Sequence, residues 1–187
     1  MLPLAFFALH ARHHLGQGAA GHLLWVCTAS NLLLAFGLLL GRPTLIRVPV
    51  MWLIAGLPLW AWDQLEQGVG PVSTFLTHFG GLAVGLLALS RARAARRVWL
   101  HAFGLYLALQ LAARLLTSPE LNVNLAHEVH GSWRGLFDSY WKFSVFMSAV
   151  VAPALWLTGL AMLRLFPPAG GRPKRGDYGD EVSPQAA

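Results

Sequence analysis

Long apolar segments separated by short polar joints dominate this chain and leave few ways for it to fold. Five such segments stand out, at residues 21–40, 48–62, 71–90, 98–116 and 141–166. An α-helix needs about 20 apolar residues to cross the hydrocarbon core of a bilayer. Only 12% of the residues are charged, whereas soluble domains are roughly one quarter charged. The pattern predicts an all-α fold, a polytopic transmembrane helix bundle of about five spans.

The two ends of the chain differ from the predicted bundle at residues 21–166. Residues 1–9 are apolar but much shorter than a span, so residues 1–20 are expected to form an interfacial segment with a short helix. Residues 167–187 are rich in Pro, Gly and charge and show no apolar periodicity. This composition predicts a disordered cytoplasmic tail.

Prolines and glycines predict local features of the spans. Pro49 and Pro58 predict a kink in the second span, and Pro153 predicts one in the last. Gly81 and Gly85 are spaced as in a GxxxG motif, and the small residues of this motif let two helix backbones approach each other. The third span is therefore expected to pack closely on a neighbour.

The positive charge of the chain is concentrated in joints between apolar segments. The net charge is +6, but the basic residues do not line one amphipathic or aromatic face, which argues against a nucleic-acid partner. Ten of the 14 Lys and Arg residues lie after the first and third spans and after the last. With five spans, the positive-inside rule predicts a cytoplasmic C-terminus and an external N-terminus.

Polar residues occur at similar depths in several predicted spans. Cys27 and His78 both lie about 10 Å inward from the outer ends of their spans, given a rise of about 1.5 Å per residue. Residues three and four apart share a helix face, and this spacing relates Cys27 to Ser30 and Asn31, and Thr74 to Thr77 and His78. Polar side chains in a bilayer face the bundle interior. We therefore expect one cavity open toward the outer leaflet.

Acyl transfer is the chemistry that this cluster fits. A neighbouring imidazole turns a thiol into a nucleophile by taking its proton, so Cys27 is the candidate nucleophile and His78 the candidate base. Thr28 is the competing nucleophile on the same helix. Asn31, Gln110 or Arg114 then stabilise an oxyanion or hold a phosphate.

Simpler interpretations of the same residues remain open. A single membrane cysteine commonly serves as a small packing residue, and amide side chains commonly hold helices together. The chain is then a small transporter or a lipid- or ligand-binding membrane protein. A bis-histidine haem needs two facing histidines, whereas His78 and His101 lie toward opposite leaflets. We expect no cofactor and no metal, and membrane lipids as partners.

The long joint before the last span is unusually polar and aromatic. It carries Asn122, Asn124, Trp133, Asp138 and Tyr140. Loops held on a rigid scaffold often supply binding residues. These residues are expected to fold over the outer mouth of the cavity as a lid or a head-group site. An interfacial connector is the alternative.

Short motifs give the chain a resemblance to a known family. Trp25-Val-Cys-Thr-Ala-Ser-Asn31, Trp52-Leu-Ile-Ala-Gly56, and Pro71 followed by Thr77-His78-Phe-Gly resemble the bacterial YwaF-type integral membrane proteins and their eukaryotic transmembrane acyltransferase relatives. Asn122-Val-Asn124-Leu resembles their polar joint. The resemblance covers roughly residues 25–140, although this chain lacks a full first helix.

The resemblance implies a lipid acyltransferase or acyl hydrolase in the inner (plasma) membrane. In the eukaryotic relatives a membrane cysteine and histidine transfer acyl chains between phospholipids, which corresponds here to Cys27 and His78. A more distant similarity, to androgen-induced-gene-type lipid hydrolases, implies Thr28 with His78 instead. Thr74 and Asn124 join the expected substrate-binding residues.

Overall fold

The computed structural model describes residues 2–68, 70–92 and 97–167, and the predicted tail at 168–187 lies outside the described residues. All the regular elements of the described part are helices, in agreement with the predicted all-α fold class. The main helices are α1 (Leu2–Gly16), α2 (Val26–Leu39), α3 (Pro43–Ala55), α4 (Leu57–Gln67), α5 (Val72–Phe75), α6 (Gly81–Leu89), α7 (Val98–Leu116) and α8 (Tyr140–Leu165). The π-helical turn η2 (Leu76–Gly80) joins α5 to α6.

Four helical segments of the described chain are long and apolar enough to cross a bilayer, rather than the five predicted. They are Pro43–Glu66, Val72–Leu89, Val98–Leu116 and Tyr140–Leu165. The last two lie within one residue of the predicted spans. Pro43–Glu66 corresponds to the predicted span at 48–62 and begins five residues earlier. Pro43 occupies the first turn of α3, where its missing N–H costs no hydrogen bond.

The predicted span at 21–40 is wrong in its length. Residues Ala20–Leu24 form the short 3₁₀-helix η1, and extended backbone angles at Trp25 separate it from α2. The remaining 14 residues of α2 rise about 21 Å, less than the roughly 30 Å of a bilayer core.

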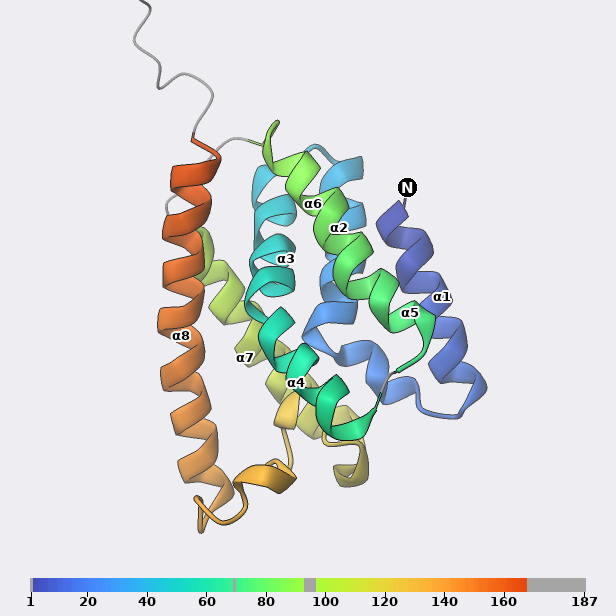
Figure 1. Ribbon diagram of the computed structural model, residues 1–187, viewed down its shortest axis with the longest axis vertical. Coiled ribbons are helices and arrows are strands. Elements are labelled where there is room, and N and C mark those ends of the chain that lie inside the picture. Colours follow the sequence, from blue (N-terminus) through green and yellow to red (C-terminus); the bar gives the residue numbers. More distant parts are fainter. Residues whose placement is uncertain (1, 69, 93–96, 168–187) are drawn as a thin grey trace, which may run out of the picture.

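The N-terminal segment forms a longer and more upright helix than predicted. Within the predicted segment 1–20, the helix α1 covers Leu2–Gly16, and it stands beside α2 and α6 (Figure 1). Its first residues lie toward the end of the bundle at which α8 ends. This arrangement differs from the predicted placement of the two termini on opposite sides.

The three prolines predicted to kink spans differ in their surroundings. Helix α3 continues through Pro49, whereas α3 and α4 are separated at Gly56, two residues before Pro58. Helix α8 in contrast continues through Pro153 for 26 residues without interruption.

Close packing around α6 confirms the expectation for its glycines. An added Cβ at Gly81 would stand only 2.3 Å from Asn31 Oδ1, and one at Gly85 only 2.5 Å from Val50 Cγ2. On α2, a Cβ at Gly37 would lie 2.5 Å from the Leu45 carbonyl oxygen. Helices α2, α3 and α6 therefore approach each other closely.

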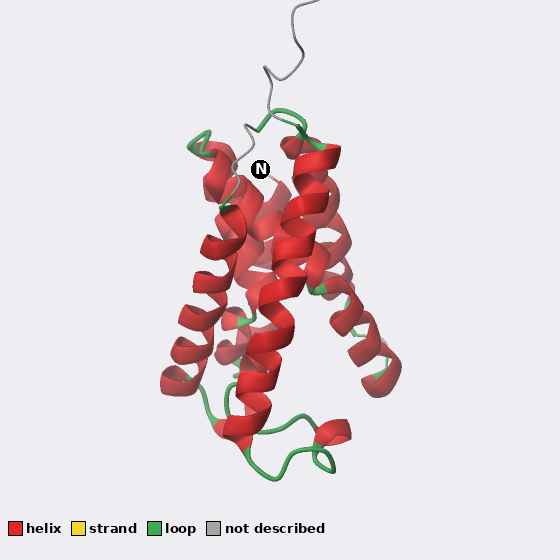
Figure 2. Ribbon diagram, turned by 90° about the vertical axis from the view of Figure 1, so that its left-hand side faces the viewer, coloured by secondary structure: helices red, strands yellow, loops and turns green. Residues whose placement is uncertain are grey.

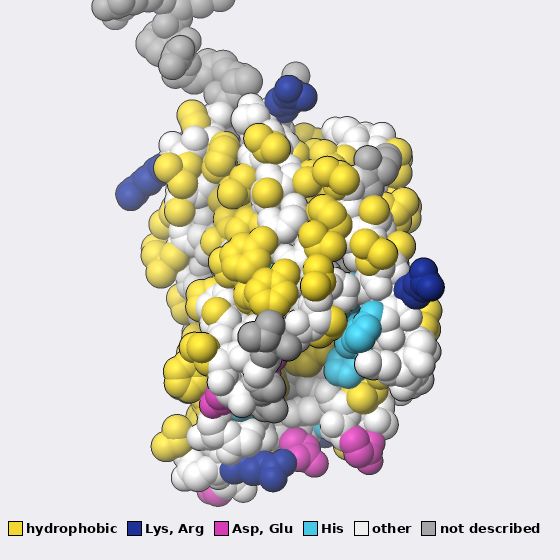
Figure 3. All heavy atoms as spheres, turned by 45° about the vertical axis from the view of Figure 1, so that its right-hand side comes forward, with side chains coloured by type: hydrophobic (Ala, Val, Ile, Leu, Met, Phe, Trp, Pro, Cys, Tyr) yellow, Lys and Arg dark blue, Asp and Glu magenta, His cyan; other side chains and the backbone are white. Residues whose placement is uncertain are grey.

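The bundle exterior is largely apolar. Large hydrophobic side chains are exposed along the whole length of helix α8, for example: Trp141, Val145, Phe146, Val150, Trp156, Leu157, Leu160 and Leu165. One face is covered with hydrophobic side chains above a lower end where Asp and Glu gather (Figure 3). The helices lie at different tilts to the long axis, with connections at both ends (Figure 2). An apolar surface of this extent is typical of helices that face lipid.

Candidate functional site

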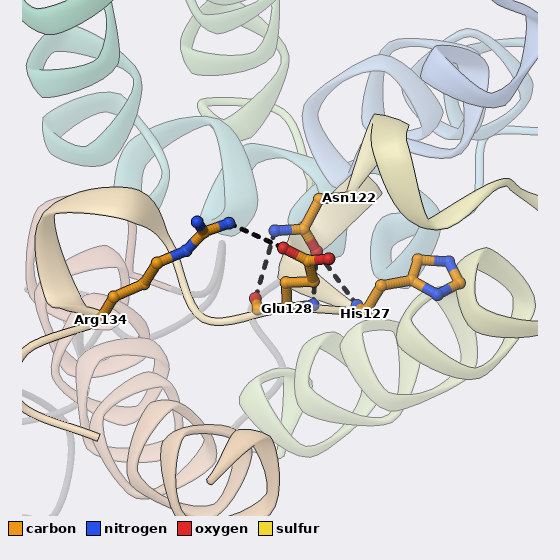
Figure 4. A network of polar contacts seen from close by, with 4 residues as sticks. All are labelled: Asn122, His127, Glu128 and Arg134. Atoms are coloured by element: carbon orange, nitrogen blue, oxygen red, sulfur yellow. Dashed lines mark hydrogen bonds and ion pairs between the residues drawn. The ribbon is translucent and has the colours of Figure 1, made fainter. Parts of the chain in front are cut away.

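The residues between α7 and α8, here called the joint (117–139), fold back onto the bundle. Asn122 organises the first part of the joint, because its Oδ1 accepts hydrogen bonds from the backbone N–H groups of His127 and Glu128, both at 3.0 Å (Figure 4). Its Nδ2 donates to the Glu128 carbonyl oxygen, and Arg134 pairs with the Glu128 carboxylate at 2.8 Å. The joint is thus a folded element.

Asn124 fastens the joint to the beginning of α2. Its Oδ1 accepts a hydrogen bond from the Val26 N–H at 2.9 Å, and its Nδ2 donates to the Leu24 carbonyl oxygen at 2.7 Å. This amide supplies the partner that an unsatisfied N–H at a helix N-terminus requires. Asn124 has a φ of +52°, a left-handed conformation that Asn tolerates better than most residues. The joint therefore packs against the bundle, as a lid requires.

Two side chains of α7 hold the joint from the other side. Gln110 Nε2 donates to the Asn124 carbonyl oxygen at 2.8 Å and lies 3.0 Å from the Tyr106 hydroxyl. Arg114 donates to the Ala126 carbonyl oxygen at 2.7 Å and stacks over the Tyr140 ring at 4.6 Å. These contacts use the amide and the guanidinium to position backbone.

A cavity of about 410 Å³ lies between α4, the joint and α8. Its lining is mainly apolar, with one carboxylate and one imidazole, and comprises Pro58, Leu59, Trp62, Asp63, Leu125, His130, Trp133, Phe143 and Met147. This volume lies within the range of small-molecule sites, roughly 300–1,000 Å³.

A second space of about 80 Å³ lies next to this cavity and shares the lining residues Leu59, Leu125 and Met147 with it. Its lining adds polar groups from α7, the joint and α8, namely Tyr106, Gln110, Asn124 and Ser144. The predicted substrate-binding residues Gln110 and Asn124 therefore line a real space. The two adjacent spaces are together called the cavity below.

The other predicted site residues lie on α2, α5 and η2. Asn31 Nδ2 donates to the Thr77 carbonyl oxygen at 2.9 Å and to the Cys27 carbonyl oxygen at 3.1 Å, and the Asn31 side chain is fully buried. It thereby joins α2 to the π-helical turn, a type of irregularity that is frequent at functional sites. Its Oδ1 is buried without a hydrogen-bond partner in the described structure.

His78 is buried beside α4. Its Nδ1 lies 2.9 Å from the Thr74 carbonyl oxygen, and its ring stacks on the Trp60 indole with centroids 4.6 Å apart. The Nδ1–H therefore donates to Thr74, and Nε2 is the nitrogen left to act as a base. Thr74 thus contacts His78 through its backbone carbonyl oxygen and not through its side chain.

The two candidate nucleophiles occupy the first turn of α2. Cys27 packs on the apolar core, and its Sγ lies 3.1 Å from the position of a Cβ added at Gly56. Thr28 is 2% exposed. Among the hydrogen bonds of the described residues, none joins Cys27 or Thr28 to His78. The cavity lining includes neither nucleophile and not His78.

Several polar residues near the cavity carried no specific expectation. His130 lies within 3.9 Å of the Glu66 carboxylate, and its Nδ1 is 2.8 Å from Ser132 Oγ.

A group of histidines lies away from the cavity, where α1 meets η1. The rings of His10 and His14 are 4.4 Å apart, and those of His14 and His22 stack at 4.6 Å. Repeated histidines were the only sequence signal for this contact.

No family model, curated protein or solved structure matches this chain.

Proposed function

We propose that this chain is a multi-span membrane protein that binds an amphiphilic molecule in the cavity between α4, the joint and α8. The observation that carries the proposal is the cavity itself, with apolar walls and polar groups from Gln110 and Asn124 in its inner part. Apolar lining with a few placed polar groups is the usual composition of a ligand site. The hydrocarbon tail of the amphiphile packs against Phe143 and Met147 in the apolar part of the cavity.

The apolar exterior supports a ligand that arrives from the membrane. Trp62 is 56% exposed, and it borders both the cavity and the outer surface of α4. Tryptophan at such a position is typical of the level of lipid head groups. Membrane lipids and related amphiphiles are therefore the proposed partners.

Binding of tritiated dodecyl maltoside to the protein in lipid nanodiscs tests this proposal, with empty nanodiscs subtracted. Leu59→Trp is expected to reduce specific binding at least tenfold, because Leu59 lines both parts of the cavity. Leu107→Trp is the matched control, since Leu107 is similarly exposed on α7. Equal binding by both variants would overturn the proposal.

Acyl transfer or acyl hydrolysis through Cys27 or Thr28 with His78 is a second candidate. Its support is the Asn31–Thr77 hydrogen bond, which fastens the helix of both nucleophiles to the turn that carries His78. A lipid-like fluorophosphonate probe tests it. Loss of labelling in Cys27→Ala would identify the thiol as the nucleophile, and loss in Thr28→Ala would identify the hydroxyl. Labelling that is unchanged in His78→Ala would contradict this candidate function. Loss only in Ser132→Ala transfers the chemistry to the joint.

We propose that the protein lies in the inner (plasma) membrane and that the end of the bundle bearing the joint is on its external side, opposite the cytoplasm. The support is the excess of Lys and Arg in the segments at the other end. A reporter fused after Ala187 is expected to be active only in the cytoplasm, and one inserted in the joint only outside. Because α1 begins toward the end where α8 ends, a reporter fused before Met1 is expected to follow the C-terminal one.

A further inference from the structure

The cavity has an uneven distribution of charge in its walls. Of the residues that line its two parts, Asp63 and His130 are the ones with acid or imidazole side chains, and the lining includes no Lys or Arg. Glu66 lies one turn after Asp63 on α4 and within 3.9 Å of His130. The Asp63 carboxylate and the His130 imidazole thus both line the cavity, and the Glu66 carboxylate lies next to the imidazole.

The nearby cations are engaged elsewhere. Arg134 pairs with Glu128 at 2.8 Å, and Lys142 pairs with Asp138 at 2.7 Å. Asp63 takes part in none of the salt bridges of the described chain, and its hydrogen-bonded neighbour is the Gln64 amide at 3.4 Å. The Asp63 carboxylate thus lacks a cationic partner within the described structure.

Aromatic rings complete this part of the cavity. Trp62 precedes Asp63 on α4, and Trp133 reaches the cavity from the joint. Trp133 is held in an aromatic group with Phe137, Phe143 and Phe146, at centroid distances of 5.7 to 6.2 Å. The faces of indole rings attract cations more strongly than those of other aromatic side chains.

We infer that the amphiphile bound in the cavity carries a cationic head group, an amine or a quaternary ammonium, held by Asp63 with Trp62 and Trp133. This inference rests on the proposed function and specifies its ligand class. A quaternary ammonium cannot donate strong hydrogen bonds, and indole faces with one carboxylate satisfy it without them. An anionic head group would meet Asp63 and Glu66 without a Lys or Arg in the lining to balance them.

Binding of three tritiated dodecyl amphiphiles to the full chain in nanodiscs tests the inference. Dodecyltrimethylammonium is expected to bind about tenfold more tightly than dodecyl maltoside, and dodecyl sulfate more weakly than both. Asp63→Asn is expected to remove the preference for the cation over dodecyl maltoside. Glu120→Gln, which removes an exposed carboxylate of the joint away from the cavity lining, is the control and is expected to keep the preference.

The outcomes separate the two proposals. Equal binding of the cationic and neutral amphiphiles, or a preference that survives Asp63→Asn, overturns the cationic ligand and leaves the cavity proposal standing. Failure of all three amphiphiles to bind above the Leu59→Trp level overturns both. Tighter binding of dodecyl sulfate also contradicts the inference. Unchanged thermal unfolding of Asp63→Asn shows that its effect on binding is local.

Discussion

The two ends of the bundle are held together in different ways. Toward the end where α8 finishes, α2, α3 and α6 meet through Gly37 and Gly85, where a single added Cβ would collide with a neighbour. Toward the other end, the joint is tied to α2 and α7 by Asn124 and Gln110, whose amides bond to backbone groups. The first end combines close helix packing with hydrogen bonds from Arg47 to the Ala92 and Phe166 carbonyl oxygens, whereas amide side chains fasten the joint at the second.

The cavity proposed to bind a ligand lies at the end where the joint is tied by amide side chains. At the other end, Gly37 and Gly85 bring the helices into close van der Waals contact, and a space of about 660 Å³ lies beside them, lined mainly by residues of α2, α3 and α6. Hydrogen bonds to backbone instead hold the joint at a set distance and leave space between its aromatic side chains and α4. Substitutions at the two ends separate the contribution of the amide hydrogen bonds from that of close helix packing.

Asn124→Ala is expected to produce the largest loss of stability. It breaks hydrogen bonds to Val26 N–H and to the Leu24 carbonyl oxygen, and leaving both backbone groups unpaired costs about 3 kcal/mol. Asn122→Ala is the matched control, because Asn122 also has a positive φ but bonds only within the joint. Thermal unfolding in detergent measures both. An equal loss in the two variants would contradict the link to α2.

Gly37→Ala probes the opposite end of the bundle. Its Cβ would stand 2.5 Å from the Leu45 carbonyl oxygen, and because backbone cannot rotate away, the expected loss is about 2 kcal/mol. Gly104→Ala on α7 is the control, since a Cβ there meets nothing within 4 Å. It is expected to be neutral or to stabilise by up to about 1 kcal/mol, because Ala favours helix. A harmless Gly37→Ala would show that α2 and α3 are less closely packed.

The sequence predicted the spans best where polar residues mark both ends. Helices α7 and α8 match the predicted 98–116 and 141–166 within a residue, because Arg97, Thr117 and Ser139 interrupt the apolar pattern. The break at Trp25 was not predictable in this way. Residues 21–40 form a nearly unbroken apolar run, and the helix is interrupted where Leu24 and Val26 bond to a residue almost a hundred positions later.

The candidate site illustrates the same limit. Spacing predicts which residues share a face and at what depth, but it does not predict how a helix is rotated in the bundle. Asn31 and Gln110 face inward as expected, yet each bonds to a carbonyl oxygen of a neighbouring segment. The cavity lining at Asp63 and His130 depends on the fold of the joint, and this fold depends on left-handed residues such as Asn122.

Acidification is expected to act on a third contact, between α1 and its neighbours, with the smallest effect on the whole bundle. Burial, together with nearby histidines, lowers the pKa of both His10 and His14 from 6.5 to about 4. His10 faces His14, His78, His13 and His22. The neutral rings are favoured in the packed state, so the contribution is fully present above pH 6.5. It is lost as pH falls toward 4, because detached α1 binds protons first.

Hydrogen exchange as a function of pH measures this effect. After correction for intrinsic exchange rates, α1 is expected to lose protection between pH 6.5 and 4, while α7 keeps its protection. His14→Gln is expected to flatten the response, because it removes the ring that contacts His10, His13 and His22. His101→Gln is the control, since His101 is exposed on α7 and bonds only to the Arg97 carbonyl oxygen of its own helix. Loss of protection in α7 at the same pH would show that the whole bundle opens, and would contradict a separate contact at α1.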